Sequence, residues 1–465
     1  MARMSAVGEA RSGVRAAMTR AQDDPLVRNS FFLMATTATT AAVGFLFWLI
    51  VARLYPVTAV GKATSLLSVL SLLSYISLIG MGASLIRHLP TTTRRAEHVS
   101  TSLLAVGGSA LLIALVFVVV VPFTSPELAF VGDSAIHIAI FAALATCAAL
   151  NLLTNSVFVA MRAARYNLLI NGGLMGIAKI ALPFVFVFAG AMGIFAASGV
   201  ASLLAAVASV LAIRRRLKIR VRWAFSAGLA RRTFRFSMGY YVTACLNLAP
   251  SLIIPILVLN QLGPEIAAGY FMAFQIATVI NSVSFAVGEA LFAEGAHRQE
   301  GLGALARRSL AIMGAVTGPA VVIVVVLAVP ALALFGPSYV STARGALIVL
   351  AVSAFAVAFH SWTSFLIKIT DQFAAMIVTE AVFAVATTVL VVLAASHGAV
   401  WIAAAWGAGN VLSGVVAGVA LLAARRRRAV RPGGQLTRGA DAGGPGRNGR
   451  GVRAGQHALA QEESG

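Results

Sequence analysis

Twelve long runs with few or no charged residues fill most of this chain, and they constrain its fold more than any other feature. A helix needs about 20 apolar residues to cross roughly 30 Å of hydrocarbon, and each run has about that length. The first six runs cover 31–52, 63–86, 99–124, 134–161, 166–189 and 191–213. The last six cover 236–260, 266–288, 309–335, 345–367, 373–395 and 399–424. The pattern predicts an all-α, polytopic membrane protein with twelve transmembrane helices.

The boundary between the fifth and sixth runs carries no charge. Between Lys179 and Arg214 the chain has 34 uncharged residues, which is too many for one crossing but suits a tight helical hairpin. We therefore expect two helices that turn near Gly190 and Gly193.

The composition excludes a soluble enzyme. Charged residues make up 11% of the chain, whereas soluble domains have about 25%. The net charge of +21 is found in short connectors and in two tails, as membrane topology requires, so we expect no nucleic-acid partner. Cys147 and Cys245 both lie inside apolar runs, which indicates small core residues and not a disulfide.

The distribution of Lys and Arg predicts the orientation. With the N-terminus in the cytoplasm, the inner segments hold 32 basic residues and the outer segments hold three. Such an asymmetry follows the positive-inside rule. We therefore expect a multi-pass protein of the bacterial plasma (inner) membrane with both termini cytoplasmic.

Five segments follow from these boundaries. A basic cytoplasmic N-tail (1–29) precedes a first six-helix bundle (30–213), and a basic cytoplasmic linker (214–235) precedes a second bundle (236–424). The C-tail (425–465) has few large apolar residues and should be disordered, with a basic start that contacts anionic membrane lipid.

The two halves resemble each other at a fixed offset. Leu54, Pro56, Ala59, Gly61 and Gly80 recur 208 positions later, as Leu262, Pro264, Ala267, Gly269 and Gly288. Six helices per half leave both halves in the same orientation. This indicates a parallel repeat, with a substrate path between the two bundles.

The start of the first half carries a family resemblance. An apolar helix ends in Ala-Arg-Leu, a short Pro-containing loop follows, and Gly61 opens the next helix, which ends in a Gly-x-Gly-x-x-x-x-Arg stretch at Gly80, Gly82 and Arg87. This resembles the polysaccharide-transporter (O-antigen flippase, Wzx-like) branch of the multidrug/oligosaccharidyl-lipid/polysaccharide exporter superfamily.

The resemblance implies a V-shaped pair of six-helix bundles, as in multidrug exporters of that superfamily. It implies a flippase that moves a polyprenyl-diphosphate-linked oligosaccharide from the cytoplasmic to the outer face for polysaccharide biosynthesis. A polysaccharide polymerase and glycosyltransferases are possible partners, and no cofactor is implied.

Three alternatives remain. A multidrug exporter of the same superfamily predicts an acidic, cation-binding cavity. A major-facilitator transporter usually has a Gly/Asp/Arg-rich signature after its second helix, where this chain has RHLPTTTRRAEH. A membrane-embedded glycosyltransferase usually resembles a chain with a large outer catalytic loop, whereas the longest outer loop here (122–133) holds only two carboxylates. With no metal-spaced His/Cys cluster either, we expect neither a metal site nor an enzyme.

Lys179 is the clearest charge within the membrane. It lies about 13 residues after Tyr166, roughly 20 Å from the cytoplasmic end of its helix, and such a charge costs at least about 2.5–3.5 kcal/mol. We expect it to face a central aqueous cavity and to attract the substrate's diphosphate. The alternative is a cation satisfied by helix carbonyls or by one carboxylate.

His360 and Glu380 form a second candidate site. Both lie about 11–12 Å from the inner surface on the two helices of a predicted hairpin. A carboxylate beside an imidazole could carry a proton and couple transport to the proton gradient. The alternative is a static polar clamp.

Two pairs of asparagines share helix faces. Asn151 and Asn155 are four residues apart, as are Asn167 and Asn171. Their amides could line a sugar path or join helices. Arg87 and Arg162, at predicted helix ends, are interfacial anchors or line the inner vestibule through which a diphosphate would enter.

Overall fold

The computed structural model describes residues 25–222, 225–297, 302–370 and 372–429. The predicted tails (1–29 and 425–465) therefore lie largely outside the described residues. The chain divides into two compact units, Met1–Ala420 and Leu421–Gly465. The first unit holds the helices and cavities that follow, and the described residues of the second unit are helical.

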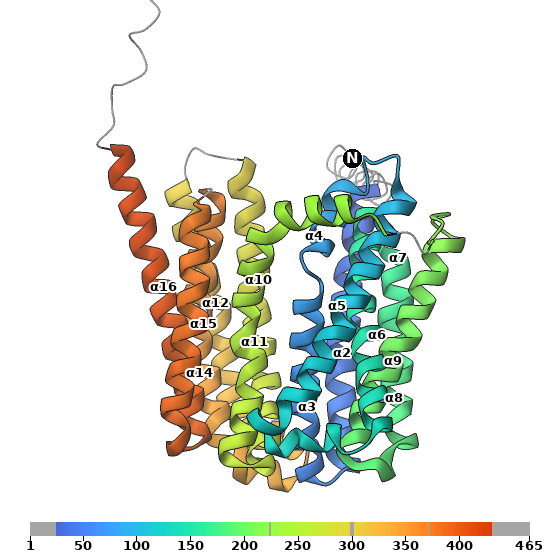
Figure 1. The fold of residues 1–465 in the computed structure, drawn as a ribbon. Helices are drawn as coiled ribbons and strands as arrows, with labels where there is room; N and C mark the ends of the chain where they lie inside the picture. The colour runs from blue at the N-terminus through green and yellow to red at the C-terminus, as the bar shows by residue number, and fades with distance from the viewer. Residues whose placement is uncertain (1–24, 223–224, 298–301, 371, 430–465) are drawn as a thin grey trace, which may run out of the picture. The chain divides into compact units, whose positions relative to one another are not determined.

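The first half is a set of helices joined by short turns (Figure 1). Two short 3₁₀ helices lie in connections between the α-helices, η1 (Pro126–Gly132) and η3 (Val187–Ala189). A third segment, η2 (Leu168–Leu174), is a π-helix. The α-helices are α2 (Pro25–Leu54), α3 (Val57–Ser77), α4 (Met81–His88), α5 (Arg95–Thr124), α6 (Ala135–Ala160), α7 (Ala164–Asn167), α8 (Met175–Val185) and α9 (Gly190–Arg215).

The second half repeats this organisation with longer unbroken helices. Its 3₁₀ segment η4 (Ala395–His397) joins the last two helices. The α-helices are α10 (Ala227–Leu262), α11 (Pro264–His297), α12 (Leu302–Val326), α13 (Ala328–Ala333), α14 (Pro337–Ile369), α15 (Phe373–Ala394) and α16 (Ala399–Ala429).

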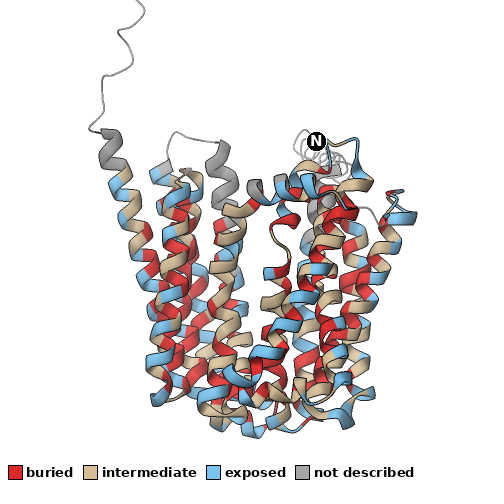
Figure 2. Ribbon diagram, in the orientation of Figure 1, coloured by how far each residue is buried: buried red, intermediate tan, exposed pale blue. Residues whose placement is uncertain are grey.

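Twelve helices of the described residues are long and apolar enough to cross a membrane, which confirms the predicted number. The fifth and sixth are separate, Ala164–Val185 and Val187–Arg215, and they turn at Gly190 as expected. Large apolar side chains such as Phe123 (87% exposed) and Phe188 (84% exposed) point outward, and Figure 2 shows buried residues gathered between the helices. This is the arrangement of a protein whose solvent is lipid.

The second predicted helix is broken. It starts at Val57, before the predicted residue 63, and stops at Ser77, after which α4 begins at Met81. The break coincides with two residues in the left-handed region, Ile79 (φ 48°) and Gly80 (φ 72°). Glycine adopts this conformation without strain, but a β-branched residue does so rarely. The break is therefore a point of local backbone strain.

The two halves meet at the end of the bundle that carries the turns at Pro56 and Gly263, named here the Pro56 end. Helix α3 packs against both α10 and α11, and the Ser65 hydroxyl donates to the Pro255 carbonyl at 2.8 Å. A Cβ on Gly61 would lie 1.8 Å from the Pro264 carbonyl oxygen. Two positions of the internal repeat thus meet here, and the close contact requires glycine.

Arg53 adds a second connection at the Pro56 end. Its guanidinium donates to the carbonyls of Leu334 at 2.8 Å and Ala333 at 3.0 Å. These carbonyls lie at the C-terminal end of α13, where they lack partners within the helix and favour a cation. Arg53 therefore joins the first half to the second by capping a helix.

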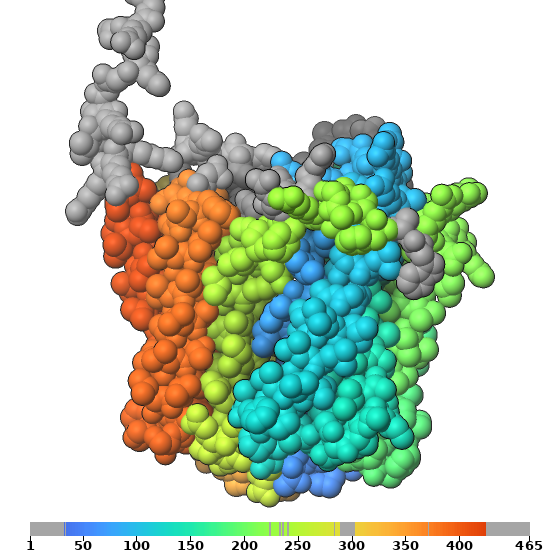
Figure 3. Space-filling model, viewed as in Figure 1, coloured from blue at the N-terminus to red at the C-terminus, as the bar shows by residue number. Residues whose placement is uncertain are grey.

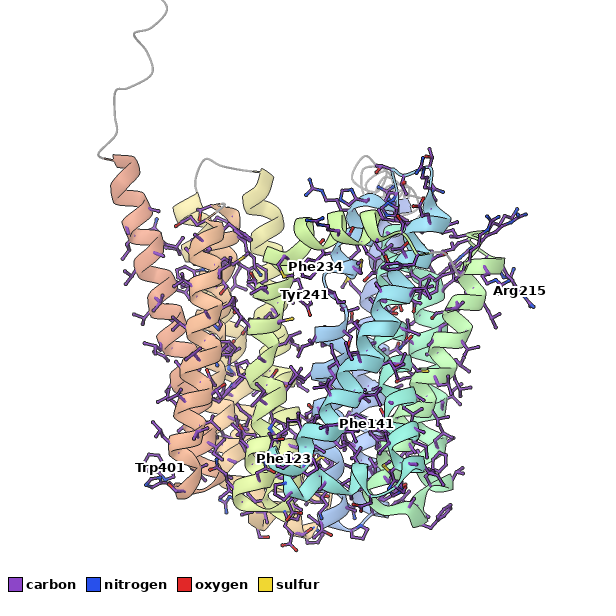
Figure 4. All side chains as sticks on the ribbon, viewed as in Figure 1. Phe123, Phe141, Arg215, Phe234, Tyr241 and Trp401 are labelled. Carbon is purple, nitrogen blue, oxygen red and sulfur yellow. The ribbon has the colours of Figure 1, made fainter. Side chains whose placement is uncertain are left out.

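The opposite end of the bundle, near residues 216–226, is named here the linker end. There the Tyr241 hydroxyl of α10 donates to the Ile76 carbonyl, next to the break in the second helix. Figure 4 shows Tyr241 on the side of α10 that faces the first half. Figure 3 shows α10 lying along the atoms of the first half on this face of the molecule. The halves therefore touch near both ends of the bundle.

Candidate functional site: two polar cavities and an asparagine cluster

A cavity of about 480 Å³ lies between the two halves. Helix α3 contributes a stripe of serines to its wall, Ser68, Ser71 and Ser74. Each donates its hydroxyl proton to a carbonyl four residues earlier, at 2.7–2.9 Å. Since these protons are used within the helix, the serines present hydrogen-bond acceptors to the cavity.

Lys179 lines this cavity from α8. Among the described residues that form the wall there is no carboxylate, and no ion pair or hydrogen bond joins Lys179 to another described residue. The lysine is thus a lone cation on an otherwise uncharged wall of polar and apolar side chains. Such a cavity attracts an anion whose charge compensates the cost of placing Lys179 within the membrane.

A second cavity of about 660 Å³ lies on the side of the second half. Ser251, Phe274 and Thr278 line both cavities, so the two spaces adjoin across α10 and α11. The second cavity is lined by His360, Glu380 and Lys368. Lys368 is one of the basic residues counted on the inner side, and its position near a helix end gives no sign in the sequence that it borders a cavity.

Hydrogen bonds hold the Glu380 carboxylate in place. Asn247 donates to one oxygen at 2.9 Å and Ser364 donates to the other at 3.4 Å. His360 Nε2 lies 3.8 Å from the carboxylate, and both residues are less than 5% exposed. The structure thus brings together the two residues that the sequence placed at equal depth.

His360 also contacts two residues of α16. Its Nδ1 lies 3.1 Å from the Asn410 amide oxygen, and its Nε2 lies 3.1 Å from the Ser413 hydroxyl. That hydroxyl is also 2.9 Å from the Thr379 carbonyl. Ser413 can donate its proton to a neutral His360, or donate it to Thr379 and accept a proton from a charged His360. Rotation of this one hydroxyl therefore accommodates both the neutral and the charged imidazole.

Four asparagines of the first half form one cluster, the asparagine cluster, around Asn171. Asn171 donates to the oxygens of Asn155 at 2.8 Å and Asn167 at 2.6 Å, and it accepts from Asn151 at 3.0 Å. The π-helix η2 carries Asn171, and the Met175 amide at its end donates to Ile170, five residues earlier. A single π-helical turn inside an α-helix is frequently found at a functional site.

Arg87 and Arg162 lie outside these cavities. Both are exposed at the linker end, Arg87 in the last turn of α4 and Arg162, with φ 51°, in the turn between α6 and α7. Neither lines the cavities of 480 and 660 Å³. No group of three His, Cys, Asp or Glu comes together in the described part of the chain as metal ligands would.

The chain matches a known family and a known fold. Residues 26–292 match the family model described as polysaccharide biosynthesis protein, whereas no curated protein matches the sequence. The fold is similar to that of the lipid II flippase MurJ in an inward closed conformation, with a TM-score of 0.67, 13% identity, and coverage of 84% of this chain and 87% of that chain.

Two further solved structures show the same fold. A MATE family multidrug resistance transporter of the MOP superfamily, inward-facing, has a TM-score of 0.64 at 14% identity and covers 84% of this chain and 94% of that chain. A MOP superfamily transporter from Pyrococcus furiosus, described as having a binding pocket of reverse polarity, has a TM-score of 0.54 at 16% identity and covers 87% of this chain and 96% of that chain. These similarities confirm the predicted exporter fold.

Proposed function

The chain belongs to the polysaccharide biosynthesis protein family, and we propose that it is a flippase for a polyprenyl-diphosphate-linked oligosaccharide. The observation that carries this proposal is Lys179, a cation without a described partner on the otherwise uncharged wall of a cavity between the halves. A diphosphate supplies the missing negative charge, and the serines and asparagines of the wall suit sugar hydroxyls. MurJ, with the same fold, is named as a lipid II flippase, which supports a lipid-linked substrate here.

The proposed direction follows from the charges. The basic connectors favour an orientation with the linker end in the cytoplasm and the Pro56 end at the outer face of a bacterial plasma membrane. Arg53, Gly61 and Ser65 connect the halves at the Pro56 end. In this state the outer face is closed, and transport requires these contacts to separate. A polymerase and glycosyltransferases would act before and after this step, as partners in the same biosynthesis.

Coupling to protons is a second part of the proposal. His360 and Glu380 lie 3.8 Å apart beside the second cavity, and rotation of the Ser413 hydroxyl accommodates either protonation state of His360. A proton taken up from the outer face and released to the cytoplasm would drive the return of the empty protein.

Glu380 also favours a second candidate function, the export of cationic drugs. This carboxylate accepts hydrogen bonds from two side chains and lies near His360, which satisfy part of its charge. Lys368 lines the same cavity and repels cations. The charges of the two cavities together favour an anionic substrate.

Depletion of the protein from its host cells tests the proposed function. Mass spectrometry of the polyprenyl-diphosphate lipids should show accumulation of one defined lipid-linked oligosaccharide. An unchanged lipid profile with new sensitivity to cationic drugs would instead establish the multidrug exporter. Sugar transfer by the purified protein would establish a glycosyltransferase.

A further inference from the structure

A small space of about 260 Å³ opens behind the wall of the first cavity. It is named here the amide annex, and Asn151, Asn155 and Met175 line both it and the first cavity. The remaining lining residues are Thr36, Thr37, Thr40, Asn167 and Asn171. We propose that the amide annex is a subsite that holds one neutral sugar ring of the substrate. The inference rests on the proposed function and assigns the recognition of the sugar to a defined place.

An unsatisfied polar atom points to a ligand here. Asn151 is 8% exposed, and its amide nitrogen donates to Asn171 at 3.0 Å and to the Met175 sulfur at 3.7 Å. Its amide oxygen is buried and has no hydrogen-bond partner among the described residues. Leaving such an oxygen unpaired is destabilising, because it loses its hydrogen bonds to water without gaining a partner in the protein. A ligand that donates a hydrogen bond to Asn151 would remove this cost.

The other groups of the amide annex indicate a neutral ligand. Amides and hydroxyls both donate and accept hydrogen bonds, as sugar hydroxyls do, and every residue that lines the annex is uncharged. The oxygens of Asn155 and Asn167 each accept one hydrogen bond from Asn171, which leaves each oxygen one lone pair for a further donor. A metal cation would lie close to Lys179, which follows Met175 by one helical turn.

The size and position of the annex fit one ring attached to a diphosphate. Sites for drug-sized ligands measure about 300–1,000 Å³, so a space of 260 Å³ has room for a single small unit. Met175 and Lys179 share a face of α8 four residues apart, with Cβ atoms about 5–6 Å apart. A diphosphate at Lys179 would therefore place a neighbouring sugar at the mouth of the annex.

Close helix packing keeps the annex narrow. A Cβ on Gly172 would lie 3.0 Å from Leu168 and 3.2 Å from Thr39 of α2, and one on Gly176 would lie 3.0 Å from Val43. These glycines let α2 approach η2 and α8 closely. The annex is thus shaped by the backbones of helices that pack closely against each other.

Binding of free monosaccharides by the purified full-length protein tests the inference without any lipid-linked substrate. Saturation-transfer NMR with a panel of glucose, galactose, N-acetylglucosamine and N-acetylgalactosamine should reveal at least one bound sugar. Asn151→Leu should weaken its binding about tenfold or more. Asn281→Leu is the matched control, because Asn281 is also buried with an unpartnered amide oxygen but lines the second cavity, and it should leave sugar binding unchanged.

Thermal unfolding of each variant checks the fold, and Asn155→Leu, which alters a half-buried wall residue, gives the same test if Asn151→Leu does not fold. The inference is wrong if the wild type binds none of the sugars or if both folded variants bind like the wild type. If sodium raised the unfolding temperature of the wild type but not that of Asn151→Leu, the annex would be a cation site instead. Sugar binding without lipid accumulation in depleted cells would overturn the proposed function and leave the subsite intact.

Discussion

Lys179 sets the charge of the first cavity, because no carboxylate lines that cavity among the described residues. Replacing it with methionine keeps the length and apolar stem of the side chain but removes the charge. A charge-assisted hydrogen bond contributes about 1.5–3 kcal/mol, so Lys179→Met should raise the Kd for farnesyl diphosphate, a soluble polyprenyl diphosphate, about ten- to hundredfold. Isothermal calorimetry on the purified protein measures this change.

Lys218→Met is the control for this prediction. Lys218 is exposed near the linker end and lines neither cavity, so its loss removes the same charge elsewhere. Equal binding of farnesyl diphosphate by wild type and Lys179→Met would show that Lys179 is a structural cation.

Substitution of Glu380 tests whether transport is coupled to protons. Glu380→Gln retains an oxygen that can accept from Asn247 but cannot release a proton. In vesicles, wild-type transport should accelerate when the outer face is made acidic, and the variant should lose this response while keeping its rate without a gradient. Glu265→Gln, at an exposed carboxylate of α11, should respond like the wild type. A gradient response that survives in Glu380→Gln would make the pair a static polar clamp.

Only some members of these residue clusters could be predicted from the sequence. Helical spacing predicted that Asn151 and Asn155 share a face. The equal predicted depth of His360 and Glu380 on the two helices of a hairpin indicated that these two could meet. The sequence could not predict that Asn410 and Ser413 of α16 complete the His360 network, because no sequence rule says which helix packs against that hairpin. Asn410 inside an apolar run was the available signal, since a buried amide requires a partner.

At the scale of helices, Gly61 determines how closely α3 and α11 approach. Alanine there would place its Cβ 1.8 Å from the Pro264 oxygen, and such overpacking costs about 1–3 kcal/mol. Gly61→Ala should therefore lower the Tm of the purified protein. Gly108→Ala, at a position of α5 with open space around it, should raise the Tm slightly because alanine favours helix. A Gly61→Ala protein as stable as Gly108→Ala would show that the two helices are farther apart.

The positions of the helices were more predictable than their irregularities. Long apolar runs define spans because lipid requires every backbone group to be bonded within a helix. The break at Ile79 and Gly80 was missed, since an isoleucine with positive φ has no sequence signature. Helix α10 begins at Ala227, within the stretch predicted to be linker. This start was not predicted, because the stretch is too polar for a hydropathy argument to assign it to a helix.

For the whole molecule, the internal repeat predicted two six-helix halves with a path between them. The repeat does not determine which residues meet across the halves. Gly61 of the first half contacts Pro264 of the second, whereas the equivalent Gly269 lies against Thr342 of its own half. The two halves therefore supply different surfaces to their common boundary, and their cavities differ in charge as well.

Transport by the purified protein in vesicles measures the proposed activity most directly. Lipid-linked oligosaccharide from depleted cells would be reconstituted with the protein, and its arrival at the opposite leaflet followed by oxidation with membrane-impermeant periodate. Wild-type protein should accelerate this movement well above protein-free vesicles, and Lys179→Met should lose about tenfold or more of that acceleration. Movement no faster than in protein-free vesicles, with the protein folded, would contradict the flippase.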